Sequence, residues 1–179
     1  MTNPTPATAP AVLNPTLETV RQFLAGSSLI HHVEGGGEAL SVRMVLSHVT
    51  VNLFYQVTQP RELLELICRV PVSIPPARRA AVVEFLMRVN FILRNARFLL
   101  DYSDGEVSLR MSAEIVETPP TEGQLACWLF SACTVVDGFF PALMAVTFAR
   151  MNPAQAVEQG EAAYEELLQA KKSDEPETE

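Results

Sequence analysis

Residues 75–115 read PPARRAAVVEFLMRVNFILRNARFLLDYSDGEVSLRMSAEI, and their pattern predicts a helix followed by a β-hairpin. Two prolines open the segment, at positions where a helix tolerates a missing amide. Five apolar residues then recur at helical spacing and form one stripe: Val82, Phe85, Leu86, Val89 and Leu93. We therefore expect a helix over roughly residues 76–94 that buries one face.

The hairpin is indicated by two alternating runs on either side of Asp104-Gly105. This dipeptide favours the positive φ angles of a two-residue turn, so both residues are predicted to be structural. We expect Phe98, Leu100 and Tyr102 to share one side of the first strand, because side chains alternate along a strand. Asn90 lies on the apolar side of the preceding helix, where a buried amide must find hydrogen-bond partners. We expect it to tie the helix to neighbouring backbone.

The segment also carries the motif of a known family. The run Phe85-Leu86-x-Arg88-x-Asn90-x-x-Leu93-x-x-x-Arg97-Phe98, followed by Asp104-Gly105-Glu106-Val107-x-Leu109-Arg110, resembles the YbjN-like domains of bacteria. The segment from Pro141 to Met144 fits the same pattern, and the resemblance covers roughly Leu17 to Val146. It implies a fold similar to that of type III secretion chaperones, often dimeric. It implies no reaction, cofactor or catalytic residue.

The rest of the chain predicts an α+β fold, with one antiparallel sheet of about five strands and helices packed against it. Asn14-Pro15 has the form of a helix start, and alternating residues follow near 28–34, 40–46, 49–57 and 62–72. We expect four segments: a disordered leader over 1–13, the α+β domain over 14–151, a helix over 152–172 and a disordered acidic tail over 173–179.

The last helix of the domain is expected to begin at Thr121, which forms a capping box with Gln124. From Leu125 to Ala149 its one charged residue is Asp137, so it is either buried on all sides or membrane-spanning. Asp137 argues against membrane insertion, and Pro141 is expected to kink the helix. One side can cover the sheet. The other side carries candidate interface residues for a second copy of the chain: Trp128, Phe130, Phe139 and Phe140.

Charge argues against a nucleic-acid partner. The net charge is −8, and the 26 residues from Ala154 onward hold eight acids and two lysines. No concentrated basic face is left, and five arginines are interpreted as a solvated helix face: Arg78, Arg79, Arg88, Arg94 and Arg97. The N-terminus does not resemble a signal peptide, and three cysteines do not make a disulfide framework. We expect a cytoplasmic protein.

No pattern in the chain predicts a catalytic, metal-binding or cofactor-binding residue. His31 and His32 are adjacent and would face opposite sides of a strand, and His48 has no metal-ligand spacing to another residue. We therefore expect a non-enzymatic, chaperone- or adaptor-like protein-binding module with a regulatory use, binding a protein client or its own copy. The alternative is a small-ligand sensor or small enzyme with a pocket between helix and sheet, which needs converging polar groups.

Overall fold

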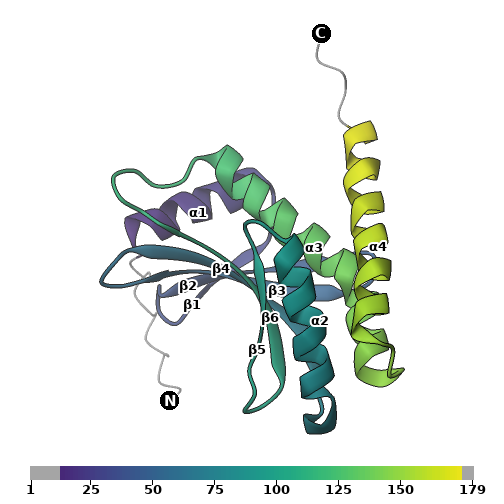
Figure 1. Ribbon diagram of the computed structural model, residues 1–179. Coiled ribbons are helices and arrows are strands. Elements are labelled where there is room, and N and C mark those ends of the chain that lie inside the picture. The colour runs from purple at the N-terminus through teal and green to yellow at the C-terminus, as the bar shows by residue number, and fades with distance from the viewer. Residues whose placement is uncertain (1–12, 175–179) are drawn as a thin grey trace, which may run out of the picture.

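The computed structural model describes residues 13–174 of the chain. It begins with helix α1 (Pro15–Gly26), continues through four strands to helix α2 (Arg79–Ile92) and a hairpin, and ends in two long helices (Figure 1). The strands are β1 (His31–Glu34), β2 (Ala39–Val45), β3 (Thr50–Thr58), β4 (Leu63–Ser73), β5 (Arg97–Leu100) and β6 (Glu106–Glu114). The last helices are α3 (Glu122–Phe148) and α4 (Pro153–Asp174), and a 3-10 turn, Pro76–Arg78, precedes α2.

The sheet is antiparallel throughout, in the order β1-β2-β3-β4-β6-β5, which confirms the predicted α+β class. It has six strands where about five were expected, because the short run His31–Glu34 pairs with Ala39–Val42 as an edge strand. One face is apolar, with Leu53, Leu66 and Leu109 almost fully buried, and helices α1, α2 and α3 cover it. The core therefore lies in one layer between sheet and helices.

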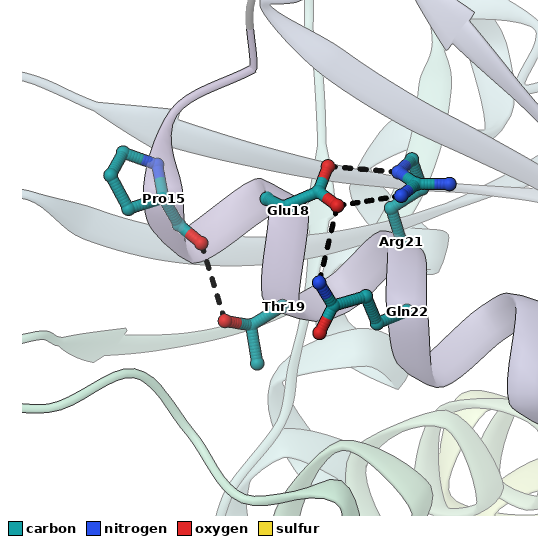
Figure 2. A network of polar contacts seen from close by, with 5 residues as sticks. All are labelled: Pro15, Glu18, Thr19, Arg21 and Gln22. Atoms are coloured by element: carbon teal, nitrogen blue, oxygen red, sulfur yellow. Dashed lines mark hydrogen bonds and ion pairs between the residues drawn. The ribbon is translucent and has the colours of Figure 1, made fainter.

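Helix α1 starts where the sequence indicated, with the Asn14 side chain accepting a hydrogen bond from the Thr16 amide and Pro15 in the first turn. Its outer face carries a polar network (Figure 2) in which Arg21 and Gln22 both donate to the Glu18 carboxylate. The hydrogen bonds from Arg21 are the main reason that the pKa of Glu18 falls to about 2. The network is exposed, so it keeps this helix face soluble rather than holding the fold together.

Helix α2 is joined to its surroundings by side chains expected to face water. Arg78 donates to the Val146 carbonyl near the end of α3, and Arg79 donates to the carbonyls of Ile74 and Tyr102. The solvated helix-face interpretation was therefore wrong for Arg78 and Arg79, and Arg94 and Arg97 lie beyond the end of α2, in the α2–β5 loop and in β5. The guanidinium groups of Arg78 and Arg79 donate hydrogen bonds to carbonyl oxygens that have no partner within a helix or sheet.

The Asn90 side-chain amide joins α2 to β5. It donates to the Phe98 carbonyl at 2.9 Å and accepts from the Phe98 amide at 2.7 Å.

The β5–β6 connection is longer than the predicted two-residue turn. Strand β5 ends at Leu100, and the Gly105 amide donates to the Asp101 carbonyl, so residues 101–105 form the loop. Tyr102 consequently lies in the loop, 58% exposed, rather than beside Phe98 and Leu100 on the strand. Gly105 does adopt a positive φ of 84°, and a Cβ there would lie 2.4 Å from the Ile74 carbonyl oxygen. The Asp104 carboxylate accepts from the Glu106 amide, which fixes the loop exit.

Helices α3 and α4 pack closely against each other (Figure 1). Two glycines allow this approach: a Cβ on Gly138 would lie 2.8 Å from the Tyr164 Cα, and one on Gly160 would lie 2.5 Å from the Phe139 ring. The second side of α3, expected to face another chain, is therefore largely covered within this chain by α4. Phe139 is 1% exposed and contacts the rings of Phe85 and Tyr164, so its assignment to an interface was wrong.

Helix α3 is long and apolar enough to cross a bilayer, and 61% of its most apolar window is buried inside the fold. It runs as a single helix through Pro141, which is exposed. Helix α4 continues to Asp174, beyond the predicted helix end at residue 172 and into the predicted tail. Most of the predicted leader (residues 1–12) and of the predicted tail (residues 175–179) lies outside the described residues, and the proposed domain boundaries stay predictions.

Candidate functional site

A groove of about 540 Å³ lies between α3, α4 and the turn that joins β2 to β3. The C-terminal part of α4 forms one wall, because this helix extends past its crossing with α3 (Figure 1). The lining is mainly apolar, with polar groups at Ser47, Thr134 and Asp137. The apolar residues are Val45, Leu46, Phe130, Cys133, Leu167 and Ala170.

Asp137 anchors this groove, although its side chain is only 7% exposed. One carboxylate oxygen, Oδ1, accepts from the His48 amide at 2.7 Å, and Oδ2 accepts from the Ser47 amide at 3.2 Å. The His48 Nδ1 atom lies 3.4 Å from Oδ1. A buried charge is costly without partners, and here two amides of the β2–β3 turn provide them. The carboxylate thereby fixes the turn against α3, next to the exposed Val45 at the end of β2.

The four residues predicted to form one interface point to different places. Phe130 lines the groove, whereas Trp128 lines two hollows on another side of α3. Residues two positions apart on a helix differ by about 200° around its axis, so the side chains of Trp128 and Phe130 lie on different sides of α3. Phe139 lies in the core, and the half-buried Phe140 packs near Phe85 and Leu143. Of these four residues, Phe130 is therefore the one that lines the groove.

The predicted structural residues do not line the groove. Asn90 lies between α2 and β5, Asp104 and Gly105 lie in the hairpin loop, and Pro141 lies on the exposed side of α3. Their contacts are with backbone groups of neighbouring elements or with solvent. They hold the sheet and helices in place without contributing to the groove.

The titratable groups near the groove offer little chemistry. Within residues 13–174, no three His, Cys, Asp or Glu side chains are grouped to hold a metal ion. The Asp137 carboxylate faces the two turn amides, and His48 is half-exposed beside it. Burial raises the pKa of the Cys68 thiol, which disfavours the reactive thiolate. Cys127 is exposed, whereas Cys68 and Cys133 are buried.

Sequence reasoning did not identify Asp137, Val45 or Leu167 as parts of one site. A lone acid in a helix of apolar residues was the available signal for Asp137, since such a group needs partners once the helix is buried. No comparable signal marks Val45 or Leu167, because their proximity depends on where α4 crosses α3.

The chain is similar to known proteins in sequence pattern and in fold. The family model of YbjN, described as "Putative bacterial sensory transduction regulator", matches residues 16–145. Among solved structures, the chain is similar to "YbjN, a putative transcription regulator from E. coli", with 16% sequence identity and a TM-score of 0.53. That likeness covers 66% of this chain and 83% of the E. coli protein, and at this identity it shows the fold. No curated protein matches the chain.

Proposed function

We propose, from the premise that this chain belongs to the YbjN family, that it is a non-enzymatic regulatory module that binds another protein. The family description and the E. coli relative both refer to regulation, which supports the general role. The proposed action is chaperone- or adaptor-like, takes place in the cytoplasm and uses the fold to hold an apolar segment of a client. The chaperone-like part of this proposal rests on the resemblance of the fold to that of type III secretion chaperones.

The groove between α3, α4 and the β2–β3 turn is the observation that carries this proposal. It is concave, mainly apolar and open to solvent at Val45, which is 78% exposed. Amphipathic segments commonly bind in apolar grooves between helices. The single acid in its lining already accepts two amide hydrogen bonds, so the groove offers shape and apolar area rather than a reactive group.

We expect Val45→Glu to abolish client capture without loss of stability. Val45 is already largely exposed, so the substitution costs little folding free energy, but it places a charge in the apolar groove. The measurement is affinity capture from the native cell lysate with quantification by mass spectrometry, and clients should fall at least about tenfold.

Val116→Glu is the matched control, because Val116 is 82% exposed and does not line the groove. Thermal denaturation of both variants checks that each remains folded. Equal capture by the unmodified chain and by Val45→Glu would overturn the proposal, as would an equal loss in both variants.

We also propose that the protein forms a two-fold homodimer through α2. Met87 and Phe91 are one helical turn apart and are 63% and 91% exposed, respectively. Exposed apolar side chains that are neighbours on a helix face form a patch, and a patch of this kind can be buried in an isologous contact. This surface replaces the second side of α3, whose Phe139 is buried against α4.

Phe91→Glu is expected to convert the dimer into a monomer, with self-association weakened by about tenfold or more. Sedimentation at micromolar concentration should show a dimer for the unmodified chain and a monomer for the variant. Val116→Glu again serves as control and should remain dimeric. A monomer for the unmodified chain would reject this part of the proposal and leave the groove hypothesis intact.

A further inference from the structure

A second hollow lies at the open end of the sheet, away from the groove. Strand β5 begins at Arg97, which pairs with Arg110 of β6, so β6 continues beyond it from Met111 to Glu114. The α2–β5 loop and Trp128 of α3 line the hollow at this edge. The resulting hollow has a volume of about 500 Å³, within the range of small-molecule sites. Its polar lining includes Arg94, Asn95, Arg97 and Ser112.

The charge of this hollow is positive and uncompensated. Two of its lining residues, Arg94 and Arg97, are exposed arginines, and no acid is among the lining residues. Arg110 lies directly across from Arg97, and its Nε atom is buried without a hydrogen-bond partner in the part of the chain that is described. None of the three arginines forms an ion pair within residues 13–174. Like charges opposite each other on neighbouring strands are unfavourable, so an anion bound here would relieve that repulsion.

The nearest acid on the neighbouring strand is already engaged. Glu65 of β4 lies across from Ser112, and its carboxylate accepts hydrogen bonds from Gln56 and Thr58. Asn90 also lines the hollow, but its amide is bound to the Phe98 backbone. The groups left to bind a ligand are therefore the guanidinium groups, the Asn95 amide, the Ser112 hydroxyl and the indole ring of Trp128.

We propose that this hollow binds a nucleoside phosphate. Guanidinium groups match phosphate oxygens in a two-pronged geometry, and two lining arginines without an acidic partner favour an anion of more than one charge. The half-buried indole of Trp128 provides a face on which a base can stack. The Asn95 amide and Ser112 hydroxyl can pair with polar edges of the base or sugar. A neighbouring hollow of about 340 Å³ shares residues 93–96 with this site and is also lined by Met111, Val135 and Tyr164.

The chain has one tryptophan, so its fluorescence reports directly on this site. The experiment titrates the full-length protein with adenosine diphosphate and, separately, guanosine diphosphate, with calorimetry as a second readout. We expect saturable quenching by at least one nucleotide and much weaker binding of adenosine or inorganic phosphate alone. Arg97→Gln and Arg94→Gln should each weaken nucleotide binding by about tenfold or more, because each removes a charged hydrogen bond to phosphate.

Arg88→Gln is the matched control. It removes the same charge from an exposed arginine that pairs with Glu84 on α2 and does not line the hollow, and it should leave binding unchanged. Absence of saturable binding at millimolar nucleotide would overturn the proposal. So would equal weakening by Arg88→Gln, or binding of inorganic phosphate or adenosine as tight as that of the nucleotide.

Discussion

Replacing Asp137 by alanine is expected to lower the free energy of unfolding by about 4 kcal/mol. The change removes the acceptor for two amides of the β2–β3 turn and leaves both without a partner next to α3. Loss of a hydrogen bond to a charged group costs roughly 1.5–3 kcal/mol, and removing one partner of a buried charged contact costs about 3–5 kcal/mol. Urea denaturation at neutral pH measures the difference.

His48→Ala is the matched control for Asp137→Ala. It removes the imidazole that lies 3.4 Å from the carboxylate but keeps both backbone hydrogen bonds to Asp137. Because His48 is half-exposed, its loss should cost less than about 1 kcal/mol. If the two variants are destabilised equally, the carboxylate does not anchor the turn in the way described here.

Gly160→Ala is expected to destabilise the protein by about 2 kcal/mol, although helices generally favour alanine over glycine. Alanine is favoured over glycine inside a helix by roughly 1 kcal/mol, so helix propensity alone predicts stabilisation. Here the added methyl group would lie 2.5 Å from the Phe139 ring and would force α4 away from α3. Overpacking of this kind typically costs about 1–3 kcal/mol. The same substitution at Gly138 meets the Tyr164 backbone and should be at least as damaging.

Gly123→Ala is expected to change the stability in the opposite direction from Gly160→Ala. Gly123 lies in the first turn of α3, and a Cβ there would have none of the described atoms within 4 Å. We expect this variant to be neutral or slightly more stable by thermal denaturation. Stabilisation by Gly160→Ala to the same extent as Gly123→Ala would mean that α3 and α4 are not in close contact.

Local signals in the sequence predicted much of the fold. The Asn14-Pro15 start, the Thr121 capping box and the alternating strands all correspond to observed elements, because each depends on neighbours within a few residues. The hairpin loop was predicted less well. Of Asp104-Gly105, only Gly105 has the predicted positive φ, and Arg79 and Ile74 contact the loop from another part of the chain.

The candidate site could not be predicted in the same way. The apolar side chains around α3 indicated a need for cover, but not that α4 would supply it through Gly160 and Tyr164. As a residue type, Gly160 indicates only a lower helix propensity, whereas in the structure it is where α4 packs against Phe139. Once α4 is in place, Phe139 becomes core and Phe130 becomes groove lining. Which of these two residues is buried depends on where α4 crosses α3, and the periodicity of the sequence does not reveal that position.

Site-specific photo-crosslinking at Val45 tests most directly whether the groove holds a client protein. A benzophenone side chain replaces Val45 in the full chain, and Val116 carries the same group as control, since both positions are largely exposed. On irradiation of cells that produce the protein, we predict a covalent adduct between position 45 and a distinct protein, and little or none from position 116. Adducts of equal yield from the two positions, or no adduct from position 45, would contradict protein binding through the groove.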